Sequence, residues 1–290
     1  MKRNHVLKYY LALGVLVLCN SLSYAQQIDL SGNWRFAIDR EETGIVDQWY
    51  MQTLREQVQL PGSMLTNGKG DPVGLQTQWT GSLFDKSFFE QEKYERYRKE
   101  DNFKVPFWLQ PNKCYTGVAW YQRDIDIPVT WKDKVIRLFF ESRVWIDEVE
   151  VGMRNALSAP QEYDLTGFLK PGKHVISIRV DNKVRSIDPG ENSHSISDHT
   201  QGNWNGIVGA MYLEAKSKIH YSHVAVFPSL SERKMAVRVK INNAETKRKK
   251  VDLIFRLEGN ETVEQRILHP GENKLELVLP LPEHIDYWDE

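Results

Sequence analysis

The sequence has no excess of either charge. Its 38 Lys and Arg residues nearly balance 39 Asp and Glu residues, so the formal net charge is -1 and the pI is about 6.7. A chain without a net field does not draw phosphates or anionic lipids from a distance. We therefore expect no nucleic-acid partner, and we interpret the short basic run 247–250 as a solvated turn or strand end.

Cysteine and long apolar runs are also scarce. The apolar run 11–19 follows Lys2 and Arg3 and precedes a small-residue site that ends at Ala25, which predicts a secretory signal peptide over 1–25 and export to the periplasm or the medium. The run is shorter than the roughly 20 residues that span a bilayer, so we expect no membrane contact beyond the signal. Removal of the signal leaves only Cys114, and the exported protein must then depend on its hydrophobic core.

Short runs with apolar residues at every second position dominate what remains. Turn residues such as Gly, Pro, Asn and Asp separate them. They are Trp120–Ile127, Val135–Phe140, Val175–Val180, Met211–Leu213, Val224–Phe227, Met235–Ile241, Val251–Leu257 and Leu275–Leu279. Many short strands joined by turns predict an all-β chain built from β-sandwiches and not an alternating βαβ fold.

The spacing of these strands changes near residue 218, where long aromatic-rich connections give way to short polar turns. We place a domain boundary there and predict one domain over 26–217 and a second over 218–290. The first contains a long aromatic-rich insert, 61–115, of the kind that is usually functional. Within this insert we expect a short helix over Lys86–Asp101 and an extended segment over Val105–Pro111.

Several motifs then point to a family. They are Leu30–Phe36, Leu60–Met64, Gly117–Arg123, Val144–Ile146, Asp164–Thr166 with Leu169–Gly172, Val180–Asn182 and Trp204–Gly209. In this order they resemble the N-terminal part of a glycoside hydrolase of family 2, the group of β-galactosidases, β-glucuronidases and β-mannosidases. The resemblance covers 27–217 and, with weaker motifs, 218–290. It implies a jelly-roll (galactose-binding-like) β-sandwich followed by an immunoglobulin-like β-sandwich.

One departure concerns a hairpin. The family often carries Asn-Gly after the Val144–Ile146 strand, the pair that best suits a type I′ turn. This sequence has Asp147 and Glu148 there. We therefore expect a different or longer loop.

The resemblance also implies a catalytic domain that the sequence does not include. In the family a downstream (β/α)₈ barrel supplies two glutamates for a retaining mechanism, which requires two carboxyl groups about 5 Å apart. The sequence ends at Glu290, where such a barrel could only begin, and 218–290 is shorter than the roughly 100 residues of an immunoglobulin-like domain. We expect a truncated, noncatalytic region of an exported glycosidase. A stand-alone carbohydrate-binding module and a purely structural scaffold are the alternatives.

The best candidate site is the stretch Asp198–Gly209. Planar amides and carboxylates bind the hydroxyls of a pyranose, and an aromatic ring packs on its apolar face. The resemblance implies that a loop at this position reaches the active-site mouth. Candidate sugar contacts are Asp198, His199, Gln201, Asn203, Trp204, Asn205 and, from the insert, Trp79. The alternative is a purely structural role, with the stretch forming an ordered turn and Trp79 packing in the core. We find no phosphate loop, metal-ligand cluster or Ser/His/Asp arrangement, so we expect no cofactor and no metal.

Overall fold

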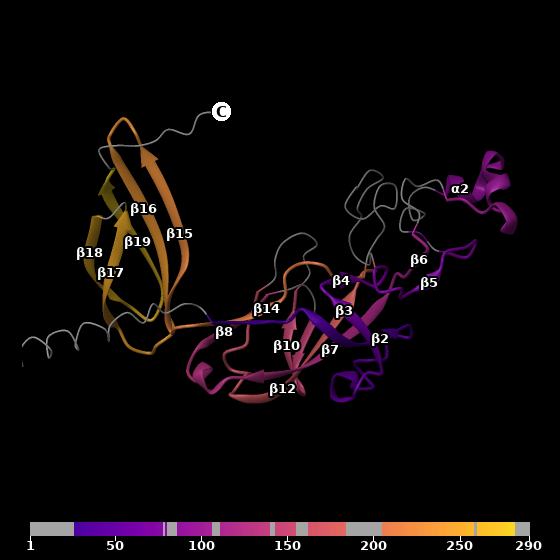
Figure 1. Cartoon of the computed structure of the whole chain (residues 1–290), viewed down its shortest axis with the longest axis horizontal. Helices are drawn as coiled ribbons and strands as arrows, with labels where there is room; N and C mark the ends of the chain where they lie inside the picture. The colour runs from indigo at the N-terminus through magenta and orange to yellow at the C-terminus, as the bar shows by residue number, and fades with distance from the viewer. Residues whose placement is uncertain are drawn as a thin grey trace, which may run out of the picture. The chain divides into compact units, whose positions relative to one another are not determined.

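The chain divides into two compact units. The computed structural model describes residues 26–77, 79, 86–105, 111–139, 143–154, 162–183, 205–257 and 260–281. One unit comprises Gln27–Ala215, and the other contains the chain from Lys216 onward (Figure 1). Strands dominate both units, so the prediction of an all-β chain with two β-sandwiches is confirmed.

The N-terminal unit, Gln27–Ala215, is built on two sheets. The four-stranded sheet has the order β1 (Gln26–Asp29), β14 (Tyr212–Lys216), β8 (Val135–Phe139), β11 (Glu162–Asp164). The six-stranded sheet has the order β10 (Val149–Met153), β9 (Arg143–Ile146), β12 (Gly172–Asp181), β7 (Val118–Ile127), β2 (Gly32–Asp39), β3 (Glu56–Leu60). The neighbouring strands of this second sheet pair antiparallel, and β12 and β7 stay in register from Gly172↔Ile127 to Asp181↔Val118.

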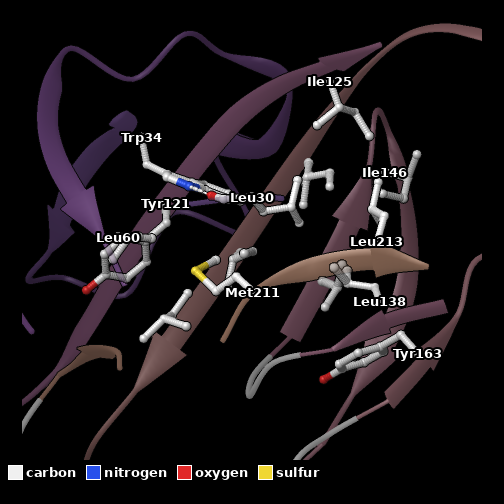
Figure 2. Packing of buried hydrophobic residues seen from close by; sticks show 14 of the residues in the cluster. Leu30, Trp34, Leu60, Tyr121, Ile125, Leu138, Ile146, Tyr163, Met211 and Leu213 are labelled. Carbon is white, nitrogen blue, oxygen red and sulfur yellow. Dashed lines mark hydrogen bonds between the residues drawn. The ribbon is translucent and has the colours of Figure 1, made fainter. Parts of the chain in front are cut away.

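The main core contains apolar side chains of both sheets. Leu138 and Leu213 come from the four-stranded sheet, and Tyr121 and Ile146 from the six-stranded sheet (Figure 2). All four are at most 2% exposed. Because successive side chains of a strand point to opposite faces, only every second residue of β7 and β9 can belong to this core.

The other face of the six-stranded sheet is buried as well. Trp120 of β7 and Trp145 of β9 belong to a second apolar cluster, and their rings lie 4.9 Å apart. Tyr50, in the short 3-10 helix η1 (Trp49–Met51), stacks on Trp145 at 5.4 Å. The buried Asp39 carboxylate accepts a hydrogen bond from the Trp120 ring nitrogen at 2.9 Å. Burial on both faces explains why Trp120–Ile127 alternates imperfectly in the sequence.

Part of the predicted insert folds on itself. The tract begins with α2 (Ser87–Glu90) and continues with the 3-10 helices η3 (Glu92–Tyr97) and η4 (Glu100–Asn102), so the expected short helix is found as one turn of α-helix followed by two 3-10 helices. Phe88 is 6% exposed and packs edge-on against Phe89 at 5.2 Å. Most of the segment expected to be extended, 106–110, lies outside the described residues.

The C-terminal unit, from Lys216 onward, has the same layered plan. A three-stranded sheet has the order β15 (Ile219–Ser229), β16 (Lys234–Asn243), β19 (Gly271–Pro280), and β17 (Lys249–Leu257) pairs with β18 (Asn260–Leu268). Val239 and Leu277 of the first sheet pack with Leu253 and Leu268 of the second. The predicted strands over Val224–Phe227, Met235–Ile241, Val251–Leu257 and Leu275–Leu279 are all present.

The hairpin expectation is confirmed in part. The loop is no longer than two residues, but it is not a type I′ turn, because Asp147 has a positive φ and Glu148 does not. Ile146 pairs directly with Val149, so Asp147 and Glu148 alone form the turn between β9 and β10. Asp147 adopts a positive φ of 52°, a conformation that Asp tolerates better than most residues. Its carboxylate accepts hydrogen bonds from the Val175 backbone N–H at 2.8 Å and bonds His174 Nδ1 at 2.7 Å. These contacts hold a tight turn without the usual Asn-Gly pair.

Candidate functional site

The predicted site residues fall into two groups. Asp198, His199, Gln201, Asn203 and Trp204 lie outside the described residues. Asn205 and Trp79 are described, and both are buried, with 2% and 4% of their surface exposed. The structure therefore shows the base of the candidate stretch and the place of Trp79.

Asn205 points into the N-terminal unit. Its side-chain oxygen accepts a hydrogen bond from the Tyr121 hydroxyl at 2.9 Å, and its side-chain nitrogen donates to the Gly117 carbonyl at 2.8 Å. Its backbone carbonyl accepts from the Met64 N–H at 2.7 Å. The amide is therefore already engaged within the domain, as the turn interpretation of this residue requires.

Asn182, which precedes residues 183–204 in the chain, also bonds Gly117. The Asn182 side-chain oxygen accepts a hydrogen bond from the Gly117 N–H at 2.7 Å, and its backbone N–H donates to the Gly117 carbonyl at 3.3 Å. Asn182 and Asn205 flank residues 183–204 in the chain. Both asparagines thus bond the backbone of one residue, an arrangement that we call the Gly117 clamp (Gly117, Asn182 and Asn205).

The chain leaves the clamp through a close backbone contact. Gly206 and Ile207 form β13 (Gly206–Ile207), which pairs antiparallel with β4 (Gly62–Ser63). Gly206 has a φ of 144°, and a Cβ there would lie 2.5 Å from the Gly62 carbonyl oxygen. Only glycine fits this position without a shift of the β4 backbone.

Burial controls the titration of the tyrosines at the clamp. Tyr121 is fully buried, and loss of hydration raises the pKa of its hydroxyl far above the usual value. Partial burial raises the pKa of Tyr115 to about 12. The Tyr115 carbonyl accepts from the Asn182 side chain at 3.0 Å, and its hydroxyl donates to the Val118 carbonyl at 2.9 Å. Both hydroxyls therefore stay protonated and act as hydrogen-bond donors, not as acid–base groups at neutral pH.

An ion pair lies beside Tyr115. Arg40 donates two hydrogen bonds to the Asp71 carboxylate, at 2.9 and 2.6 Å, and its guanidinium lies 5.6 Å from the centre of the Tyr115 ring. These hydrogen bonds lower the pKa of the Asp71 carboxyl. Both side chains are about half exposed, so solvent screens the pair and its contribution to stability is small.

The described residues offer no metal-binding group. In the ranges given above, no three His, Cys, Asp or Glu side chains cluster in a way that could hold a metal ion. Likewise, no helix among those residues has the length and apolar character needed to cross a membrane. The chemistry available at the clamp is hydrogen bonding through amides and hydroxyls.

Sequence reasoning missed the clamp itself. Gly117 and Asn182 stood in two of the motifs that we singled out, but no local pattern indicates that these motifs meet. The residues are 65 positions apart, and Gly117 and Asn205 are 88 positions apart. The only signal is the presence of an asparagine at each end of a long connection without strand periodicity.

The family follows from a match to the segment that contains the clamp. Residues 86–216 match the family model described as "Glycosyl hydrolases family 2, sugar binding domain". This segment belongs to the glycosyl hydrolases of family 2. The family 2 domain therefore includes Gly117, Asn182 and Asn205, together with the five candidate residues between Asn182 and Asn205.

Relatives of the family 2 domain are glycosidases. A β-galactosidase of Arthrobacter sp. (strain B7) is 26% identical over 171 residues, which cover 54% of this chain and 16% of the relative. A β-glucuronidase of Paenibacillus borealis is 22% identical over 170 residues, which cover 56% of this chain and 22% of the relative. The chain thus spans less than a quarter of the length of either relative.

A solved structure supports the fold. A β-glucuronidase from glycoside hydrolase family 2 superposes with a TM-score of 0.61 and 17% sequence identity, over 90% of this chain and 27% of that chain. At this identity the likeness supports the shared β-sandwich architecture alone.

Proposed function

We propose that this chain is the noncatalytic N-terminal region of an exported family 2 glycoside hydrolase that acts on terminal β-linked sugars when joined to a (β/α)₈ barrel. The sugar-binding family match over 86–216 supports the proposal, and the β-galactosidase and β-glucuronidase relatives support the substrate class. Export depends on the signal-like residues 1–25.

The Gly117 clamp is the observation that carries the site assignment. It ties Asn182 and Asn205, the residues on either side of 183–204, to one residue of the domain. That segment contains Asp198, Gln201, Asn203 and Trp204, the residue types that bind sugar hydroxyls and pack on a pyranose. His199 adds a further hydrogen-bonding group.

Asn205 and Trp79, the two candidate residues that the structure describes, have different roles in the proposal. Asn205 uses its side chain to hold the clamp, so its role in the proposal is to position the stretch. Trp79 is 4% exposed, which favours core packing, and a pocket-covering role requires that its surface become exposed. A scaffold role for the domain is the second candidate function, and this inward orientation of both side chains is what favours it.

Activity assays test the noncatalytic part of the proposal. The chain alone should not hydrolyse nitrophenyl β-glycosides, because both glutamates of a retaining site would be supplied by the barrel. Turnover that disappears when a residue of this chain is changed would refute it.

Kinetics on the chain joined to a family 2 barrel test the sugar contact. Asp198→Asn should raise KM for a nitrophenyl β-glycoside about tenfold, because the hydrogen bond from a sugar hydroxyl to a charged carboxylate is replaced by a weaker one to a neutral amide. The matched control is Asp252→Asn, the same change on an exposed position of β17. An unchanged kcat/KM for Asp198→Asn would favour the scaffold role. Calorimetric binding of galactose, glucuronate or mannose to the chain alone would favour a stand-alone binding module.

A further inference from the structure

One edge strand of the C-terminal unit is open and uncharged. Among the described strands β15 pairs with β16 alone, so its other edge has no partner strand there (Figure 1). β15 contains no Lys, Arg, Asp or Glu residue, whereas β17, β18 and β19, the other strands at sheet edges of this unit, each contain at least three. Charged residues on an edge strand normally prevent its pairing with another chain. The β15 edge lacks this protection.

The same strand exposes apolar side chains. Val224 pairs with Val239 and Val226 pairs with Val237, and paired residues of an antiparallel sheet point to the same side. Val237 and Val239 belong to the core and are 5% and 2% exposed, whereas Val224 and Val226 are 54% and 51% exposed. The face of the sheet that is buried along β16 is therefore exposed along β15.

Pro228 shows which backbone groups face the open edge of β15. Proline has no N–H, so Pro228 cannot form a hydrogen-bonded pair with its partner residue on β16. Hydrogen-bonded and non-hydrogen-bonded pairs alternate along an antiparallel ladder, and the register is unbroken from His223 to Ser229. Val224 and Val226 are therefore in non-hydrogen-bonded pairs as well, and their N–H and C=O groups point to the open edge.

A second β15 satisfies both features of this edge. The occupant must be extended, have an open edge of its own and offer apolar residues at alternate positions, and β15 has all three properties. In an antiparallel pair centred on Ala225, Val224 of one copy lies opposite Val226 of the other, so the open N–H and C=O groups of both valines are paired. No like charges meet, because β15 has no charged residue.

We propose that the C-terminal unit forms a homodimer through two-fold antiparallel pairing of β15 with β15 of a second copy. Val224 and Val226 of each copy then donate and accept backbone hydrogen bonds across the two-fold axis, and their exposed side chains form one apolar strip. Each copy uses its single open β15 edge, so the assembly closes at two chains. A contact made by one strand of each copy is below roughly 1,200 Å², the size of weak and transient interfaces. This inference is independent of sugar binding.

Sedimentation equilibrium of the full chain measures the assembly. The mean mass should rise from one chain towards two between about 1 and 200 µM, as for a weak interface. Val226→Lys puts a charge on the pairing edge, and symmetry places it twice in each dimer, so the dissociation constant should rise at least about tenfold. Val263→Lys is the matched control, because Val263 of β18 is also 51% exposed, and it should leave the constant unchanged.

Disulfide cross-linking tests the register in a chain with Cys19→Ser and Cys114→Ser. Pairing centred on Ala225 places the two Ala225 Cα atoms about 4.5 Å apart, within the roughly 4.4–6.8 Å that a disulfide spans. Ala225→Cys should therefore give a linked dimer under mild oxidation. The two Phe227 positions are then about 14 Å apart, which is four residues along the strand. Phe227→Cys, at a position that is 47% exposed, is the control and should cross-link at least about tenfold more slowly.

Three results would overturn the proposal. The first is the mass of one chain throughout this concentration range, or a mass that grows beyond two chains. The second is a dissociation constant that changes equally in Val226→Lys and Val263→Lys, which would place the interface elsewhere. The third is cross-linking of Ala225→Cys that is no faster than that of Phe227→Cys, which would exclude the register. Circular dichroism of each variant verifies that the sandwich is folded.

Discussion

The hydrogen bond between Tyr121 and Asn205 gives a sharp test of the Gly117 clamp. Tyr121 is 1% exposed and Asn205 is 2% exposed, so neither group can turn to water when its partner is removed. Tyr121→Phe leaves the Asn205 side-chain oxygen without a donor. Asn205→Leu, a change of similar volume, leaves the Tyr121 hydroxyl without an acceptor. The Gly117 carbonyl retains the Asn182 N–H in that variant.

The magnitudes follow from the cost of a buried polar group without a partner, about 1–3 kcal/mol. Each single change should therefore lower the free energy of unfolding by about that amount. The double variant has neither of these unpaired polar groups, so its free energy of unfolding should be no lower than that of the less stable single variant. The coupling free energy of the cycle should be about 1–3 kcal/mol.

Urea unfolding followed by tryptophan fluorescence measures this cycle. The signal reports mainly on the N-terminal unit, because Trp288 is the single tryptophan after residue 216. Additive effects, in which the double variant loses the sum of both single losses, would refute the claim that the two side chains satisfy each other. Native-like circular dichroism is the control for each variant.

Two further predictions concern the neighbourhood of the clamp. Gly206→Ala should cost about 1–3 kcal/mol in urea unfolding, because the new Cβ meets the Gly62 carbonyl oxygen, whereas Gly209→Ala, with nothing within 4 Å, should be close to neutral. Equal midpoints for the two variants would contradict the close contact. The raised pKa of Tyr115 predicts that its hydroxyl ionises near pH 12 in the folded chain, so its contribution to stability is present below pH 10 and is lost as the pH rises through 12. The tyrosinate absorbance of the parent should therefore show a late step that Tyr115→Phe lacks, and curves without this difference would count against the burial argument.

Period-two patterns predicted the strands well where one face of the sheet is buried. β16 is an example, since its alternating apolar residues Val237, Val239 and Ile241 all lie in the core. The rule was less informative for β7, where Trp120 and Tyr121 enter different clusters on opposite faces. The cover that buries Trp120 includes η1 and the chain around it, which carries no strand pattern. Local periodicity cannot report a cover supplied by a distant segment.

The hairpin and the candidate site show the same limit. Asp147 forms a tight turn because Val175 and His174 bond its carboxylate, and both are distant in sequence. Residue types identified Asn205 as a polar group near a tryptophan, but its direction depends on Tyr121 and Gly117. Composition indicates which side chains can bind a sugar, and only tertiary contacts show which of them are already engaged.

The Gly117 clamp has a consequence for the free energy of unfolding of the N-terminal unit when the length of the chain between Asn182 and Asn205 changes. Because Asn182 and Asn205 both bond the backbone of Gly117, the chain between them leaves and rejoins the domain at one residue. The entropic cost of closing a connection grows slowly with its length, by about 0.6 kcal/mol for each doubling. We therefore expect a change in the number of residues between Asn182 and Asn205 to add only a small closure cost to the free energy of unfolding. This makes the clamp a natural grafting point, where new ligand preferences can arise without redesign of the core.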